Sequence, residues 1–204
     1  MNISDVASTL LSHLAVRGVS AQDLPGSPGK PAGAAEGPHA VLLVLEGVLA
    51  RRRAGSAVSM GLAGAGQAVG MEGPEDDAVW LTSGRAARVS MHDVLAIEPG
   101  LLAQLRMADL AAKTDALRQE VLRHARLTLV QRLAALLHDV HQSGGQKRVA
   151  LRQSDLADLL HVRRAGVSNA AAALRAAGAV RLHRGGIEVA DLAALATVSG
   201  LTPP

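Results

Sequence analysis

The side chains of this sequence that are best suited to recognition chemistry lie between Arg163 and Asn169. Arginine hydrogen-bonds bidentately to guanine and asparagine to adenine, so a helix that carries both can read base edges in the major groove of DNA. We therefore predict base contacts from Arg164, Ala165, Gly166, Ser168 and Asn169. For Arg163 two roles stay open, a base contact and a phosphate contact.

Two helices joined by a tight turn would hold these side chains in place. Apolar residues at 3–4 spacing predict one helix through Leu156, Leu159 and Leu160, and a second through Val167, Ala170, Ala171 and Leu174. Gln153 or Ser154 is expected to cap the first helix, and Gly178 is expected to end the second. Small residues on both helices allow the close crossing that a helix-turn-helix requires.

Residues 179–189 follow as two short alternating stretches around Gly185-Gly186, a pattern that predicts a β-hairpin. A hairpin placed after a helix-turn-helix makes a winged helix. Polar and basic side chains on this module are predicted to contact DNA phosphates, which position a protein without specifying the sequence that it reads. They are Arg152, Gln153, Arg163, Arg181 and Arg184.

This arrangement resembles the C-terminal half of Crp/Fnr-type bacterial transcription regulators. The resemblance covers roughly residues 90–195 and rests on four segments in the family's order: Val130–Leu137, Val149–Leu160, Arg164–Gly178 and Arg184–Val189. It implies an N-terminal β-roll sensor of the cyclic-nucleotide-binding type, a long dimerisation helix and a homodimer. It also implies double-stranded DNA as a partner, with RNA polymerase as a second candidate partner.

Three positions of the helix-turn-helix depart from the family's pattern. Arg164 falls where the family places a base-reading arginine, but Ala165 falls where many members have glutamate. Asn169 replaces the second arginine of the catabolite-activator branch, and His161 takes a turn position usually held by glycine. The resemblance therefore implies a target sequence unlike that of the best-known members, and a slightly strained turn.

Composition excludes several other classes of site. The chain has 204 residues, no cysteine, and Trp80 as its only aromatic side chain. Disulfides, thiolate metal sites and cysteine-held iron–sulfur clusters are thereby excluded, and aromatic platforms for single strands are disfavoured. The net charge of +3 is uneven, because residues 142–190 carry eight Lys/Arg against three acids, giving +5 there and −2 elsewhere. A basic module on a near-neutral body is expected of a protein that contacts the phosphate backbone.

The N-terminal residues 1–98 are predicted to form the sensor domain. An amphipathic helix is expected over residues 3–17, with Val6, Leu10, Leu11 and Leu14 on one side, and an irregular loop over 23–39. A buried strand, a Glu46-Gly47 turn and a second strand follow within residues 40–53. Further short strands are expected at residues 58–65, 78–81 and 86–89, before a short helix capped by Ser90.

A glycine-rich segment, Gly61–Gly73, lacks both the context of a dinucleotide site and the ending of a P-loop. The resemblance places the ligand of cyclic-nucleotide binders here, held by a Gly-Glu pair and a later arginine followed by Ser or Thr. This chain has Gly66-Gln67 and then Glu75, Asp76 and Asp77, and carboxylates repel a phosphate. Leu117 and Arg118 fall near the positions that contact the base. We predict that the cAMP site is lost and that no cofactor is bound, while another effector stays open.

Residues 99–126 predict one long helix within a second domain of residues 99–127, with an apolar stripe that is interrupted at residues 113–115. The resemblance makes it the dimerisation helix, in which Leu102, Leu105, Leu110, Leu117 and Val121 pack on a second copy. The alternative is a core helix that folds back on its own domain. In the third domain, residues 128–204, Thr128 is expected to cap a helix over 129–140, and residues 142–145 to form a linker.

The sequence shows no nucleophile with a paired base and no paired catalytic carboxylates, so we do not expect an enzyme. His124, His138 and His141 lie on separate helical turns without a cysteine, which favours exposed or capping histidines over a metal site. No apolar run approaches a membrane span and the N-terminus lacks a signal pattern, so a cytoplasmic protein without a membrane partner is expected.

Together these patterns predict an α+β fold with an antiparallel β-roll, a long dimerisation helix and a winged helix-turn-helix. The predicted function is that of a dimeric, sequence-specific regulator that reads an inverted repeat without cAMP. A regulator of the same family gated by a small molecule is one alternative. A protein-interaction adaptor that docks partners on its winged helix is another, and it would lack the steep salt dependence of a DNA binder.

Overall fold

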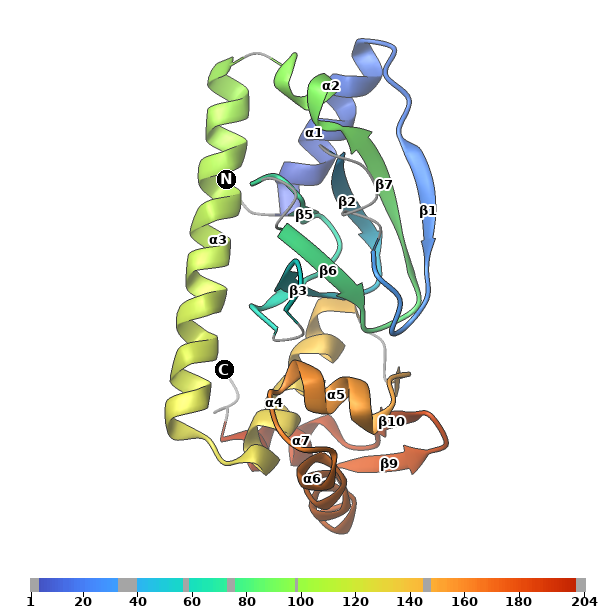
Figure 1. Ribbon diagram of the computed structural model, residues 1–204, viewed down its shortest axis with the longest axis vertical. Helices are drawn as coiled ribbons and strands as arrows, with labels where there is room; N and C mark the ends of the chain where they lie inside the picture. The colour runs from blue at the N-terminus through green and yellow to red at the C-terminus, as the bar shows by residue number, and fades with distance from the viewer. Residues whose placement is uncertain are drawn as a thin grey trace.

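The computed structural model describes residues 4–32, 40–56, 59–72, 76–97, 99–144 and 148–200. The long helix α3 (Pro99–Arg126) runs along one side of the molecule, with a roll of strands against its first half and a smaller helical module at its far end (Figure 1). This is the predicted α+β architecture, which the structure confirms.

The roll consists of two antiparallel sheets. One sheet has the strand order β1-β7-β2-β5 and the other the order β4-β3-β6. The strands of the roll are β1 Gln22–Gly26, β2 Ala40–Glu46, β3 Leu49–Arg53, β4 Leu62–Ala63, β5 Ala68–Val69, β6 Asp76–Trp80 and β7 Gly84–Ser90. Because Trp80 is the only aromatic side chain of the protein, aliphatic side chains fill the rest of the space between the sheets.

The predicted strand, Glu46-Gly47 turn and strand are present, and the turn carries the chain from one sheet to the other. Gly47 adopts φ +85°, and a Cβ there would lie 2.6 Å from the backbone oxygen of Ser83. Only glycine combines this left-handed backbone with so close an approach.

The expectation of an irregular loop over residues 23–39 is wrong for its first part. Residues 22–26 form β1, which pairs along its whole length with β7. Pro25 argued against a strand, but β1 lies at the edge of its sheet, where a residue without an N–H is tolerated. The strand expected over 58–65 is also shorter, because β4 covers only Leu62–Ala63 and residue 58 lies outside the described residues.

Two helices cover the four-stranded sheet. In α1 (Ser4–Val16) Leu10 and Leu14 are fully buried, as the periodicity predicts, and they pack with α2 (Met91–Leu95) and the start of α3. The side chain of Val6 is not among those described. Ser90 caps α2 as predicted, since its hydroxyl accepts a hydrogen bond from the His92 N–H at 3.1 Å.

The C-terminal module is a winged helix with two additional elements. Its bounds are α4 Leu129–Gly144, β8 Arg148–Val149, α5 Gln153–Leu159, α6 Arg164–Ala176, β9 Val180–His183, β10 Gly186–Val189 and α7 Leu192–Ser199. Two of these elements were not predicted from the sequence: β8, which pairs with β10, and α7, which packs against α4. A signal for α7 was present in Asp191, whose carboxylate caps the helix by accepting from the Ala194 N–H at 3.0 Å.

Three local predictions in this module need correction. Residues 142–144, expected as a linker, form the last turn of α4. The N-cap of α5 is Arg152 rather than Gln153 or Ser154, and its N–H donates to the Asp155 carboxylate at 3.2 Å. The turn of the wing consists of Arg184 and Gly185, with Gly186 already in β10.

The winged helix and the roll share one hydrophobic core. Buried residues of the roll, Val48, Ala50, Val79 and Leu81, belong to the same cluster as the buried faces of α4, α5 and α6. At the end of α4, a Cβ on Gly144 would lie 2.8 Å from a methyl group of Val48. The structure therefore holds the winged helix against the roll by direct packing as well as through α3.

Candidate nucleic-acid interface

Helix α6 is fixed by its apolar face and by a turn that has the predicted strain. Val167, Ala170, Ala171 and Leu174 are at most 2% exposed. His161 ends α5 with φ +53°, and it is the one non-glycine residue with positive φ in the described part of the chain. The N–H of Val162 then donates to the Ala157 carbonyl at 2.9 Å, which completes a left-handed cap of the Schellman type.

The exposed surface of α6 carries most of the predicted base-reading side chains. Arg164, Ala165, Ser168 and Asn169 are all exposed. Gly166 does not share this surface, because a Cβ there would lie 2.9 Å from Leu129 Cδ2. A glycine at this position allows α6 to pack closely on α4. As predicted, Gly178 stops α6, whose last residue is Ala176: Gly178 has φ +74° and donates its N–H to the Arg175 carbonyl.

The predicted phosphate-contacting residues surround α6. Arg152, Arg163, Arg181 and Arg184 are exposed and Gln153 is half-buried. Together with the wing and Arg164, the start of α5 borders a hollow of about 510 Å³. The wing also holds an internal charge pair, because Glu188 contacts Arg181 at 3.5 Å and His183 Nε2 at 2.6 Å.

The predicted dimerisation residues of α3 divide into two groups. Leu102 and Leu105 are buried in the core of their own chain, against α1 and α2. Leu110, Leu117 and Val121 are 51%, 44% and 60% exposed. With Met107, which is 68% exposed, and Thr114, these three residues repeat at alternating spacings of three and four, the pattern of a coiled-coil seam.

Between the roll and α3 lies a buried network of charges. Arg51 on β3 and Asp109 on α3 are 5% and 4% exposed, and Arg51 Nη2 lies 3.5 Å from Asp109 Oδ1. Lys113 completes the network, with Nζ at 2.8 Å from Asp109 and 3.2 Å from Glu72. Helix α3 is continuous through Lys113, where its predicted apolar stripe is interrupted. Lys113 belongs to the network that attaches α3 to the roll.

Two of the positions that the resemblance assigned to a cyclic nucleotide, Gln67 and Asp77, make contacts within the chain. Gln67 turns back on its own loop and accepts from the Gly64 N–H at 2.9 Å. Asp77 is buried and pairs with Arg52 at 2.8 Å, while Leu117 and Arg118 are exposed. Residue 75 and the side chain of residue 76 lie outside what is described.

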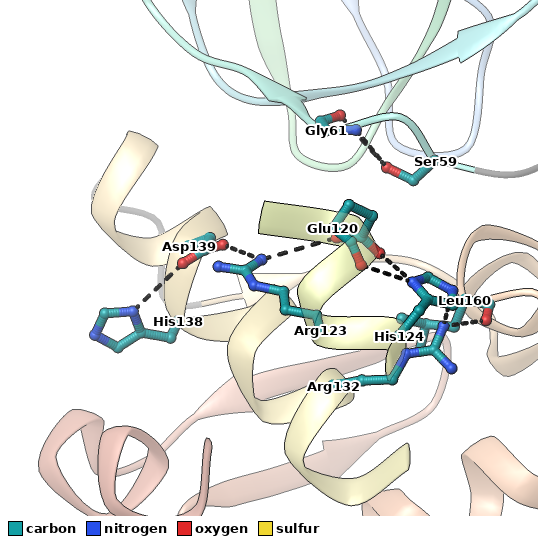
Figure 2. Close-up of polar contacts among 9 residues, drawn as sticks. All are labelled: Ser59, Gly61, Glu120, Arg123, His124, Arg132, His138, Asp139 and Leu160. Carbon is teal, nitrogen blue, oxygen red and sulfur yellow. Dashed lines mark hydrogen bonds and ion pairs between the residues drawn. The ribbon is translucent and has the colours of Figure 1, made fainter. Parts of the chain in front are cut away.

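The roll, α3 and the winged helix meet at a junction near the end of α3 (Figure 2). Ser59 of the roll donates its N–H to the Leu159 carbonyl of α5 at 3.3 Å. Arg123 on α3 pairs with Asp139 on α4 at 2.6 Å and lies 3.9 Å from Glu120. These side chains border a cavity of about 260 Å³ that all three parts of the molecule line.

Arg132 of α4 connects this junction to the turn of the helix-turn-helix. It donates to the Leu160 carbonyl at 2.6 Å and contacts His124 of α3 (Figure 2). Burial lowers the pKa of Arg132 from its ordinary value, and the nearby Glu120 carboxylate partly offsets this effect. The predicted cap of α4 lies beside this contact, since Thr128 and Gln131 exchange hydrogen bonds at 3.0 and 3.4 Å.

The three histidines of this region lie on two helices. His124 contacts Glu120 on α3, and His138 on α4 lies 3.6 Å from Asp139. His138 and His141 are half-buried, more so than the prediction of exposed histidines suggested. Within the described ranges no three His, Cys, Asp or Glu side chains are grouped as a metal ion would require.

Comparison with known families identifies the C-terminal module. Residues 131–198 match the family model described as a Crp-like helix-turn-helix domain. This region of the chain is similar to helix-turn-helix domains of the Crp type. The match spans α4 to α7, so it includes the two elements that the sequence analysis missed. No curated protein sequence matches the chain.

Solved structures share the whole fold at low sequence identity. A Crp/Fnr-family transcriptional regulator from Eubacterium rectale is 14% identical over 95% of this chain and 94% of its own, with a TM-score of 0.68. FixK2 from Bradyrhizobium japonicum is 16% identical over 91% and 100%, with a TM-score of 0.67. The regulator CLP from Xanthomonas campestris is 14% identical over 90% and 99%, with a TM-score of 0.63. The predicted resemblance to Crp/Fnr regulators is confirmed.

None of the described helices combines the length and the apolar character needed to span a membrane.

Of the contacts around the site, the network of Arg51, Asp109 and Lys113 was not predicted. Its one sequence signal is the run of three arginines, Arg51–Arg53, at the end of β3.

Proposed function

We propose that this protein is a homodimeric transcription regulator that binds an inverted repeat in double-stranded DNA without a cyclic nucleotide. The observation that carries the proposal is the exposed surface of α6, where Arg164, Ala165, Ser168 and Asn169 lie on a Crp-type helix-turn-helix. Arginine and asparagine on the first two turns of such a helix match the donors and acceptors of the major groove.

Phosphate contacts would come from the residues that flank α6. Arg152, Arg163, Arg181 and Arg184 are exposed on the helix-turn-helix and the wing, and Gln153 stands at the start of α5. Of these, Arg163 immediately precedes α6, so it can reach a base or a phosphate. Such contacts fix the position of the protein on the duplex and make affinity depend on salt.

Dimerisation would use the exposed stripe of α3. Leu110, Leu117 and Val121, with Met107, present an uncovered apolar surface at coiled-coil spacing. Leu102 and Leu105 would support this surface from inside, because they anchor the start of α3 in the roll. A symmetric dimer presents two recognition helices about 34 Å apart, one turn of DNA, and therefore reads inverted repeats.

Independence from cyclic nucleotides is supported by the pairing of the arginines on β3. Arg51 and Arg52, the buried or half-buried cations of β3, already pair with Asp109 and Asp77. A phosphate that bound Arg51 or Arg52 would have to displace the carboxylate with which that arginine is paired. We therefore propose that no cofactor is needed for DNA binding.

The direct test is binding of the ligand-free protein to DNA selected from a random pool, compared with a scrambled duplex of the same length. Affinity for the selected site is expected to fall about a thousandfold or more between roughly 50 and 200 mM salt, because a dimer would make at least six phosphate contacts. A protein-interaction adaptor would show neither selection nor this salt dependence.

One observation favours gating by a small molecule as a second candidate function. The cavity at the junction is bordered by the roll, α3 and α4 together. A ligand there would therefore contact the sensor, the long helix and the DNA-binding module at once. The similar CLP protein is described as responsive to cyclic di-GMP. A thermal shift with cyclic di-GMP, coupled to a change in DNA affinity, would support gating, and the absence of both would exclude this ligand.

A further inference from the structure

The outward surface of α6 is mostly made of methyl groups. Successive helical residues are offset by about 100°, and the four buried residues of α6 define the inward direction. The direction opposite to them carries Ala165, Asn169, Ala172 and Ala176, all of which are exposed. We call this row of four residues the midline of α6. Asn169 is the single polar side chain in it, with Ser168 beside it, and the other three residues are alanines.

Arg164 lies away from this midline. It shares one flank of α6 with Ser168 and Arg175, and it borders the hollow between the wing and the start of α5. Its long side chain can reach a base from that flank, but the centre of the helix surface is left to short side chains. A helix with an alanine midline can approach the base edges closely.

In the major groove a methyl group has one distinctive partner. Thymine alone presents a 5-methyl group there, and alanine side chains contact it, whereas asparagine pairs with adenine. Residues 165, 169 and 172 fall on the first three turns of α6, the part of a recognition helix that enters the groove.

We infer that Ala165 and Ala172 determine specificity by contacting thymine methyl groups on either side of an adenine read by Asn169. This inference rests on the proposed function and adds the identity of the half-site, which is A·T-rich at its centre. Ala172 is a base contact that the sequence analysis did not predict.

The inference can be tested by replacing single thymines with uracil. Uracil keeps every hydrogen-bonding group of thymine and lacks only the 5-methyl group. A half-site is first obtained by selection from random DNA, and each thymine in it is then replaced in turn. Fluorescence anisotropy is expected to show a loss of about three- to fivefold in affinity at two positions, the effect of one buried methyl group at each.

Glycine variants assign each methyl contact to its residue. In Ala165→Gly the penalty for uracil should vanish at one of the two positions, and in Ala172→Gly at the other. Ala173→Gly is the matched control, since it makes the same change on the same helix but off the midline. Because each comparison is between thymine and uracil duplexes with the same variant, a uniform loss of affinity from a weakened helix cancels.

The outcomes separate this inference from the function on which it rests. If a site is selected but uracil is neutral at every position, or its penalties persist in both variants, the methyl contacts are disproved while DNA recognition stands. If no sequence is enriched, both proposals fail.

Discussion

Individual side chains on α6 are expected to separate specific from general DNA binding. Arg164→Ala should cost about 1–3 kcal/mol on the selected site and little on random DNA, because a base contact is lost. Arg184→Ala is the matched comparison, since this exposed arginine at the wing turn is expected to contact phosphate. It should weaken binding to all sequences and reduce the salt slope by about one unit. Titrations at several salt concentrations measure both effects, and an equal loss on both DNAs would show that Arg164 contacts phosphate instead.

The turn before α6 offers a second test at a single residue. His161 holds a left-handed conformation that strains a side chain with a Cβ. His161→Gly should therefore raise the free energy of unfolding by roughly 0.5–1 kcal/mol after the entropy cost of glycine.

Urea denaturation checks the prediction for the turn, with His161→Ala as the control. Alanine keeps the Cβ and should give no such gain. A stabilisation of equal size in both variants would mean that the histidine ring, rather than the backbone, is unfavourable.

The exposed residues of α6 could be predicted because a helical period fixes which positions share a face. The buried set from Val167 to Leu174 was correct for the same reason. The position of Gly166 could not be predicted, because it depends on how closely α4 approaches α6.

The attachment of α3 to the roll depends on one buried carboxylate. Asp109→Ala would leave the buried Arg51 guanidinium without its partner, and such changes cost about 3–5 kcal/mol. Chemical denaturation should therefore show a large loss of stability. Asp115→Ala is the control on the same helix, because Asp115 and its partner Arg118 are both largely exposed and their pair should contribute little.

A double variant distinguishes an unpaired charge from a packing defect. Replacing Arg51 with Met and Asp109 with Leu removes both charges at similar volume, and stability should largely return. If the double variant is as unstable as Asp109→Ala, the loss comes from packing or from Lys113, which also loses its contact with Asp109, rather than from the uncompensated arginine.

The elements of the chain were predicted where the pattern is local and missed where it depends on partners. The long helix α3 and the helix-turn-helix follow from periodicity over many residues. Strand β1 depends on pairing with β7, a strand some sixty residues away, while Pro25 within it indicates a loop. The two-residue β8 likewise exists only because β10 pairs with it.

The assembly of two copies is expected to depend on the exposed stripe of α3, which consists of Met107, Leu110, Leu117 and Val121. Leu117→Glu places a charge in the middle of the apolar stripe, so sedimentation should shift from dimer to monomer. Leu122→Glu is the matched control, because Leu122 is equally exposed at 44% but lies off the stripe. The proposed interface would be wrong if both variants sedimented alike.

Which leucines of α3 face a second copy could not be read from the sequence. Five apolar residues were grouped as one stripe, yet Leu102 and Leu105 cover the roll of their own chain. The alternative of a core helix therefore holds for one face of α3, where Leu102, Leu105 and Asp109 are buried, while packing of the exposed stripe on a second copy stays a prediction. The difference arises because the two sets of residues lie on different faces of α3, and the face with Leu102, Leu105 and Asp109 is turned toward its own chain.

The whole molecule is best tested by incubating the purified, ligand-free protein with fragments of its own genome, with and without added cyclic nucleotides. We predict enrichment of the same inverted repeats in both conditions, because Arg51 and Arg52 of β3 already pair with carboxylates of the same chain. Enrichment that appears only with a cyclic nucleotide would contradict the proposed independence. The absence of any enriched sequence would contradict the function itself.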